Sequence, residues 1–146
     1  MIKKYFTKYN LELVKDNTVQ YDGGRITSSD EAYKKFIEVF KLDRKPEEHL
    51  VMFALSNTNK INGAFWVAKG STNDATFSIS GIMKRVLLCN GVKILLAHNH
   101  PSGDPTPSLT DIHSTKRIKE ACELMNLSFL DHLVIGDGCF STVKLG

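Results

Sequence analysis

Two histidines separated by one residue, His98 and His100, are the side chains best suited to metal chemistry. They follow an apolar stretch, Val92–Ala97, which predicts a buried strand, and residues at i and i+2 of an extended backbone point the same way. Imidazole is the commonest zinc ligand, and a carboxylate such as that of Asp111 can supply a third position. A catalytic zinc site holds three protein ligands and leaves one position open for water. His98, His100 and Asp111 are therefore candidate zinc ligands.

Each of these residues also has a simpler interpretation. Most His-x-His pairs are loop or surface histidines. Ser108 and Asp111 have the spacing of a helix start, with Ser108 as the N-cap and Asp111 placed favourably near the helix dipole. The metal interpretation depends on the combination of an apolar strand, two histidines, a loop rich in Pro and Gly and a helix start within one short stretch.

The combined pattern resembles a known signature. His-x-His, seven residues, Ser, two residues and Asp match the signature of the JAMM (MPN-plus) metalloprotease family. The strings His98–Gly103 (HNHPSG) and Leu130–Gly136 (LDHLVIG), with Pro107 before Ser108, are similar to its RadC branch. The similarity extends over residues 26–146. It implies a curved β-sheet flanked by helices, zinc held at one edge of that sheet, hydrolysis by zinc-activated water, and a Ser108 that stabilises the oxyanion.

The resemblance also implies a glutamate just before a buried strand. Zinc lowers the pKa of water, but a base must still take the proton and deliver it to the leaving group. Between His49 and Gly103 the only acidic residue is Asp74, whereas Glu47 and Glu48 stand directly before the apolar run that begins at Leu50. The RadC-like pattern places its glutamate immediately before a histidine and a strand, which favours Glu48. The alternative is a solvated charge at a strand start.

The elements that must position these residues alternate along the chain. Strands are expected at Leu50–Leu55, Ile61–Val67, Val92–Ala97, Phe129–Ile135 and Cys139–Thr142; helices are expected behind Thr27–Asp30, at Ser78–Leu88 and at Leu109–Met125. In the last helix the apolar spacing predicts that Met125 faces inward. This order predicts a single α/β or α+β domain over residues 26–146, with a mixed sheet covered by helices. Residues 1–25 are expected to be an N-terminal appendage, in which the loose alternation of Leu11–Tyr21 suggests a hairpin.

Composition limits the classes of protein. The chain has 146 residues, 42% of them hydrophobic, which suits one globular domain. We expect no membrane partner, because no apolar run is long enough to span a bilayer and the N-terminus lacks the apolar core of a signal peptide. Cys89, Cys122 and Cys139 are widely spaced within apolar segments, which favours reduced, buried thiols and a cytoplasmic location.

The predicted function is a zinc-dependent hydrolase, a metallopeptidase or isopeptidase acting on a peptide or protein. The alternatives are a DNA-processing hydrolase, a DNA-repair-associated protein, or a non-catalytic scaffold with this fold. An intact Glu48 argues against the scaffold. The net charge of +3, with Lys116, Arg117 and Lys119 as the only basic stripe, argues mildly against a nuclease. Longer RadC-like proteins carry an N-terminal region of the helix-hairpin-helix type, for which residues 1–25 leave no room, so its nucleic-acid role is not carried over.

Three further residues have no role in the predicted site. Trp66 is expected in the core or on a groove wall, His113 on the surface, and His132 as a structural histidine of unassigned role. The sequence does not identify the substrate or the oligomeric state.

Overall fold

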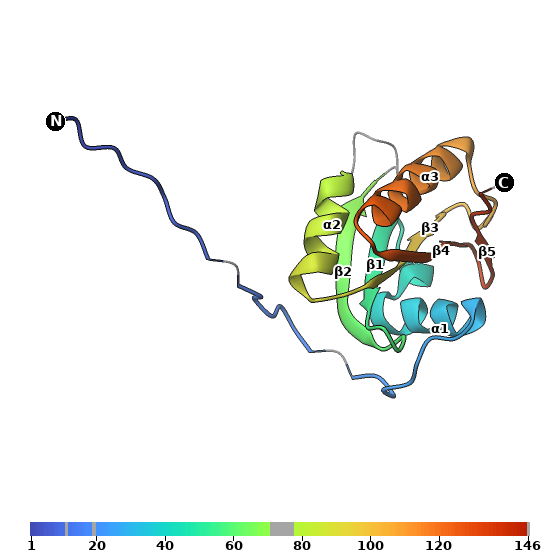
Figure 1. Cartoon of the computed structure of the whole chain (residues 1–146). Coiled ribbons are helices and arrows are strands. Elements are labelled where there is room, and N and C mark those ends of the chain that lie inside the picture. The colour runs from blue at the N-terminus through green and yellow to red at the C-terminus, as the bar shows by residue number, and fades with distance from the viewer. Residues whose placement is uncertain (11, 19, 71–77, 146) are drawn as a thin grey trace.

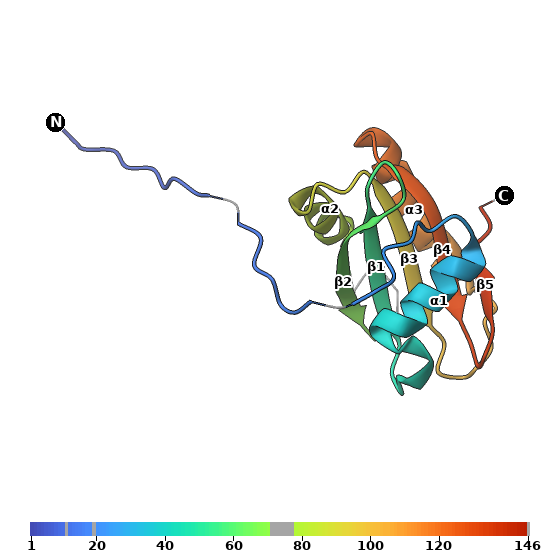
Figure 2. The same cartoon turned by 90° about the horizontal axis from the view of Figure 1, so that it is seen from below.

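The computed structural model describes residues 1–10, 12–18, 20–70 and 78–145. In this part of the chain a five-stranded sheet, in the order β2-β1-β3-β4-β5, lies between helices (Figures 1 and 2). The strands β3 and β4 are parallel and the other neighbours are antiparallel. The elements are α1 (Ser29–Phe40), the 3-10 turn η1 (Leu42–Arg44), β1 (His49–Leu55), β2 (Ile61–Lys69), α2 (Ile79–Leu88), β3 (Lys93–Asn99), α3 (Leu109–Leu124), β4 (Ser128–Ile135) and β5 (Phe140–Thr142). The predicted mixed-sheet α+β fold is confirmed.

The sheet separates two apolar cores. Figure 2 shows α1 on one face and α2 and α3 on the other. Because successive side chains of a strand point to opposite faces, Val51 and Phe53 belong to the core under α1 and η1, whereas Leu50 and Met52 belong to the core under α2 and α3. Since β1 is covered on both sides, all its residues after His49 are buried. This explains its continuous apolar sequence.

Two expectations about burial were wrong. Met125 was predicted to face inward but is 43% exposed, because α3 ends at Leu124 and Met125 is the C-cap, where the helical periodicity no longer applies. Cys139 was predicted to be a buried thiol but is exposed, because it lies in the turn between β4 and β5 rather than in a strand. All three cysteines are free, as expected.

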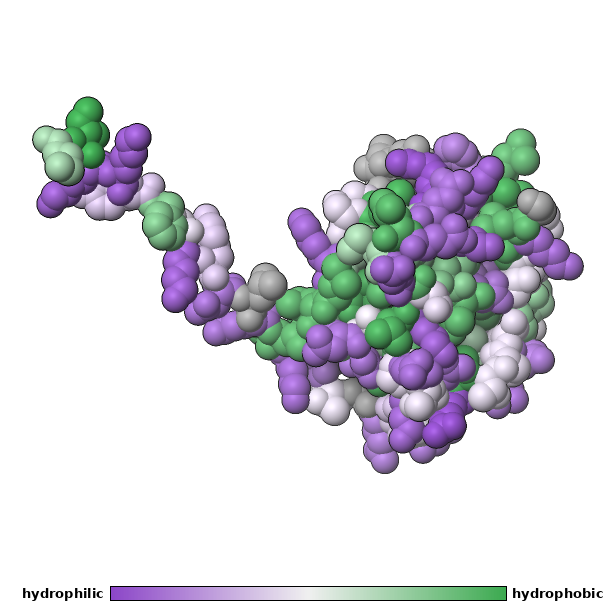
Figure 3. Space-filling model, in the orientation of Figure 1, coloured by the Kyte–Doolittle hydropathy of each residue, from purple (hydrophilic) through white to green (hydrophobic). Residues whose placement is uncertain are grey.

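The described residues before Tyr21 extend away from the domain (Figure 1). Residues 12–18 and 20–21 contain no strand, so the described part of the predicted hairpin does not form; Leu11 and Val19 lie outside the described residues. Nearly all of these side chains are exposed, and Figure 3 shows hydrophilic and hydrophobic residues interspersed along the segment. An isolated hairpin is marginally stable unless it packs an apolar face against other elements, and the described residues of this segment do not pack against the domain.

None of the helices in the described ranges is both long and apolar enough to cross a bilayer.

Candidate metal centre

The two motif histidines meet at the end of a central strand. The strand β3 runs two residues further than predicted, through Asn99, so His98 is a fully buried strand residue. The Nε2 atoms of His98 and His100 are 3.0 Å apart. Since β3 is the third of five strands, the site lies at the sheet edge that strand ends form, and not beside an outermost strand.

Asp111 completes the group from the start of α3. Its Oδ1 lies 3.3 Å from Nε2 of His98, and its Oδ2 lies 3.3 Å from Nε2 of His100. The helix start sets this direction through a capping box: the Ser108 Oγ accepts from the Asp111 N–H at 3.0 Å, and Oδ2 of Asp111 accepts from the Ser108 N–H at 2.7 Å. Asp111 can therefore serve both as a capping residue and as a site residue, because the capping box directs its carboxylate toward the two histidines.

The loop after β3 fixes the proton of His100. Its Nδ1 lies 2.9 Å from the backbone carbonyl of Asp104, and a carbonyl only accepts, so Nδ1 is the donor. A neutral imidazole then keeps its lone pair on Nε2, facing His98 and Asp111. This loop packs closely on the end of β4. Gly136 permits the close approach, because a Cβ there would collide with the Gly103 carbonyl, and the Asp137 N–H donates to that carbonyl at 2.9 Å.

Glu48 stands beside the group, one residue before β1. Its Oε1 lies 3.6 Å from Nε2 of His98 and 3.9 Å from Nε2 of His100. Burial raises the pKa of Glu48, and the two histidines lower it in part. Glu47 lies apart from the group: its side chain is 57% exposed and pairs with Lys69 at 3.1 Å.

Asn99 holds the segment that carries Glu48, and sequence reasoning missed it. Its Oδ1 accepts from the His49 N–H at 2.8 Å, and its Nδ2 donates to the carbonyls of Glu47, at 3.0 Å, and Lys45, at 3.3 Å. It is 3% exposed and lies between the two motif histidines. Its position inside the motif is the one signal that the sequence offered.

The donor set fits a metal ion. Glu48, His98, His100 and Asp111 each offer one ligand atom, and these atoms all lie within 4.8 Å of one another. Tetrahedral zinc with bonds of about 2.0–2.1 Å separates its ligand atoms by roughly 3.3–3.4 Å. The two Nε2 atoms are 3.0 Å apart, and each lies 3.3 Å from an oxygen of Asp111, Oδ1 for His98 and Oδ2 for His100. Both Glu48 distances to the histidines are longer, as expected of a group beside the ligands.

The remaining predicted residues lie around this group. Ser108 is exposed at the helix N-cap. His113 is exposed on α3, as expected. Trp66 is 46% exposed and lines, with Lys45, His49 and Lys69, a hollow of about 370 Å³ on the side of β1 that faces β2. It is therefore a groove wall. The Lys45 ammonium lies 5.4 Å from the indole centre.

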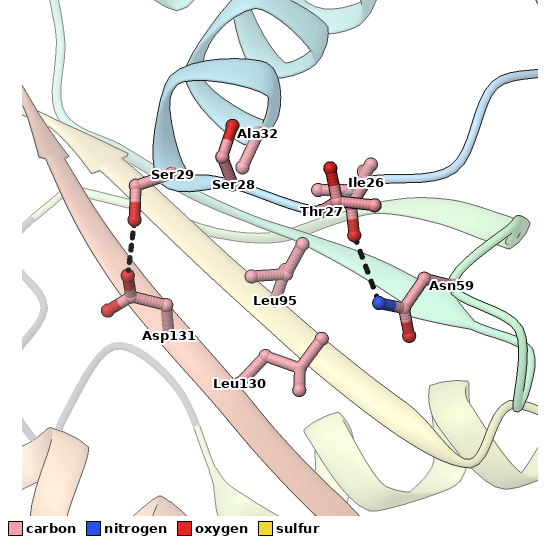
Figure 4. Close-up of a pocket in the computed structure, with 9 residues that line it drawn as sticks. All are labelled: Ile26, Thr27, Ser28, Ser29, Ala32, Asn59, Leu95, Leu130 and Asp131. Carbon is pink, nitrogen blue, oxygen red and sulfur yellow. Dashed lines mark hydrogen bonds between the residues drawn. The ribbon is translucent and has the colours of Figure 1, made fainter.

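Asp131 and His132 point to opposite faces of β4. Asp131 lines a second hollow, of about 220 Å³, beside the start of α1 (Figure 4). It accepts a hydrogen bond from the Ser29 hydroxyl at 3.2 Å, and burial raises its pKa. His132 is 2% exposed on the α3 side, with Nε2 at 2.7 Å from Nδ1 of His98. Burial, reinforced by His98, lowers the pKa of His132 well below its ordinary value.

A mixed sheet between helices defines a JAMM-type domain, in which two histidines and two carboxylates that could hold a metal ion meet where its central strands end and α3 begins. The family model described as RadC-like JAB domain matches residues 26–146, and the chain belongs to this family.

Relatives carry names that state no activity. A UPF0758 protein of Enterococcus faecalis is 36% identical over 121 residues, which cover 83% of this chain and 51% of that protein. One from Carboxydothermus hydrogenoformans is 36% identical over 105 residues, covering 72% and 46%. One from Clostridium botulinum is 42% identical over 98 residues, covering 67% and 43%. The chain spans about half the length of the curated relatives it matches.

Proposed function

We propose that this domain is a zinc-dependent hydrolase of the metallopeptidase or isopeptidase type. The observation that carries the proposal is the convergence of His98, His100 and Asp111 on one point, with the half-buried Glu48 carboxylate beside them. Zinc, when bound, supplies a Lewis acid that activates water at neutral pH. The free cysteines are consistent with a reducing compartment such as the cytoplasm.

The protein side chains divide the remaining work. His98, His100 and Asp111 hold the ion. Glu48 takes a proton from the attacking water and delivers it to the leaving amine. Its raised pKa suits both transfers, because a catalytic group works best as base and as acid when its pKa lies near the working pH. The Ser108 hydroxyl, whose oxygen accepts from the Asp111 N–H, still has its own proton to donate toward the oxyanion.

An extended peptide suits the surroundings of this site. Among the described strands β2 lies at the edge of the sheet and pairs only with β1, so its outer backbone groups can bind an added strand. Its end lies next to the proton-transfer group: Lys69 is the register partner of His49, and the Gly70 N–H donates to the Glu48 carbonyl at 2.7 Å. A strand bound along β2 would therefore end next to Glu48.

Elemental analysis tests the metal site first. Purified protein should contain about one zinc per chain, as expected for a single catalytic site. His98→Ala and His100→Ala should each abolish the zinc, whereas His113→Ala, on the exposed face of the same region, should retain it. Full zinc in both motif variants would show that the ligand assignment is wrong.

Cleavage assays test the substrate class. Zinc-loaded protein is incubated with peptide libraries and with single- and double-stranded DNA, with Glu48→Gln as the control for contaminating enzymes. Peptide cleavage that Glu48→Gln lacks would support the proposal. Cleavage of DNA alone, lost in the same variant, would overturn it in favour of a DNA-processing hydrolase.

A further inference from the structure

A chain of short hydrogen bonds runs behind His98, on the side away from Glu48. Nδ1 of His98 lies 2.7 Å from Nε2 of His132. Nδ1 of His132 lies 2.7 Å from Oγ1 of Thr115, and that hydroxyl donates to the Asp111 carbonyl at 2.6 Å. Thr115 and His98 are fully buried and His132 is 2% exposed.

The direction of every proton in this chain follows from its last member. The Asp111 carbonyl can only accept, so it takes the single hydroxyl proton of Thr115. The threonine oxygen must then accept from His132, which places the His132 proton on Nδ1. A fully buried imidazole is neutral unless a charge is paired with it, so Nε2 of His132 carries a lone pair and accepts from Nδ1 of His98.

This chain of hydrogen bonds, from Asp111 through Thr115 and His132 to His98, is called the relay below. Its last step sets the tautomer of a proposed metal ligand. With its proton on Nδ1, neutral His98 keeps a lone pair on Nε2, the atom that lies 3.0 Å from His100 and 3.3 Å from Asp111. The opposite tautomer would place a proton where the metal ion should bind. Histidine ligands usually obtain this orientation from a carboxylate, a carbonyl or water, and here a second histidine and a threonine occupy that place.

We propose that His132 and Thr115 are positioning residues that hold His98 in the Nδ1–H tautomer and so present its Nε2 lone pair to the metal ion. The proposal rests on the proposed metal site. It gives His132 a function that neither core packing nor direct metal ligation provides.

Nitrogen-15 NMR of labelled histidines in metal-free protein reads the tautomers directly. Both His98 and His132 should show a protonated Nδ1 and an unprotonated Nε2. A proton on Nε2 of either ring would overturn the relay. This measurement needs neither zinc nor a substrate, so it judges the relay even if the proposed hydrolase activity fails.

Zinc affinity tests the consequence with a matched pair of variants. Thr115→Val keeps the shape of the side chain but removes the hydroxyl, and should raise the zinc Kd by roughly 10–100-fold, the usual effect of losing a partner behind a ligand. Thr115→Ser keeps the hydroxyl and should bind like the wild type. His132→Phe should weaken binding, and His132→Gln, which retains an acceptor for His98, should restore part of it. Wild-type affinity in Thr115→Val and His132→Phe would overturn the proposal.

Discussion

Glu47 and Glu48 are neighbours with different surroundings. The Glu48 carboxylate faces the two motif histidines in a half-buried position, whereas the Glu47 carboxylate pairs with Lys69 at the surface. Glu47 lies in the bend before β1, which turns its carboxylate toward Lys69 and away from the histidines. Only one of two chemically identical side chains can therefore reach a proton at the site.

Glu48→Gln should separate catalysis from metal binding. Removing a general base lowers the rate by about 10²–10⁴-fold, while zinc content should remain that of the wild type because the two histidines and Asp111 are unchanged. The measurements are kcat on any cleaved peptide and zinc by elemental analysis. The matched control, Glu47→Gln, should turn over normally. An inactive Glu47→Gln with an active Glu48→Gln would assign the base to Glu47.

The three thiols should differ in reactivity. Burial raises the pKa of Cys122 to about 11 and also raises that of Cys89, whereas Cys139 is exposed. The thiolate is the reactive form, so iodoacetamide at pH 8 should modify Cys139 first and Cys122 last, with the Cys122 rate still rising as the pH approaches 11. Peptide mass spectrometry gives the order, and unfolding in urea should equalise the rates. Equal rates in the native protein would contradict the burial of Cys122.

At the scale of elements, a helix start and a strand end together build the site. The capping box of α3 aims Asp111, and the extension of β3 places His98 and Asn99 in a buried sheet. Each of these features also stabilises its own element. Activity and stability must therefore be measured separately in each variant.

Ser108 variants distinguish its cap from its proposed oxyanion role. Ser108→Ala should lower the free energy of unfolding by about 0.5–2 kcal/mol. Ser108→Gly should lower it by only about a few tenths of a kcal/mol, because glycine is a tolerated N-cap. Both variants lack the hydroxyl, so both should lose roughly 10²–10³-fold in kcat, the usual effect of removing an oxyanion donor. Urea unfolding and turnover give the two values. Near-normal kcat in Ser108→Gly would leave Ser108 as a cap only.

Asn99→Ala should disturb Glu48 and leave the metal ligands in place. It removes the acceptor for the His49 N–H and the donors to the Glu47 and Lys45 carbonyls. A misplacement of about 1 Å costs roughly 10²-fold in rate, so kcat should fall by that order while zinc stoichiometry holds. Asn57→Ala, at an exposed position, is the control. Loss of zinc with kcat per bound zinc unchanged would show that Asn99 supports the ligands instead.

At the scale of the molecule, the sequence predicted what is local. The apolar runs, their caps and the spacing of His98, His100 and Asp111 lie within short segments, so element types and the candidate ligands could be inferred before the structure. The contact between His98 and His132 joins residues 34 positions apart. It exists because β4 pairs in parallel with β3, which no local pattern specifies. The contact of His132 with His98 could not be inferred from the sequence for this reason. The bonds from Asn99 to the segment before β1 depend in the same way on the pairing of β1 with β3.

The boundary of the domain is testable by truncation. Among the described residues, Tyr21 and Asp22 interact with α1 through Lys35, at an ion pair of 2.8 Å in which the Asp22 side chain is 69% exposed, and at a cation–ring distance of 5.5 Å. Surface ion pairs of this kind contribute little. Ile26 differs: it is 4% exposed in the α1 core, and its N–H and carbonyl both bond to Asn59 at 3.0 Å. The folded unit should therefore begin between these residues.

A chain that starts at Gly23, and so lacks Tyr21 and Asp22, should keep the Tm and the zinc stoichiometry of the full chain. Ile26→Ala in the full chain should lower the free energy of unfolding by about 2–5 kcal/mol, because it leaves a cavity beneath α1. Thermal unfolding followed by circular dichroism compares the two. A truncated chain whose Tm falls as far as that of Ile26→Ala would show that the N-terminal segment belongs to the folded domain, and the boundary at Ile26 would be wrong.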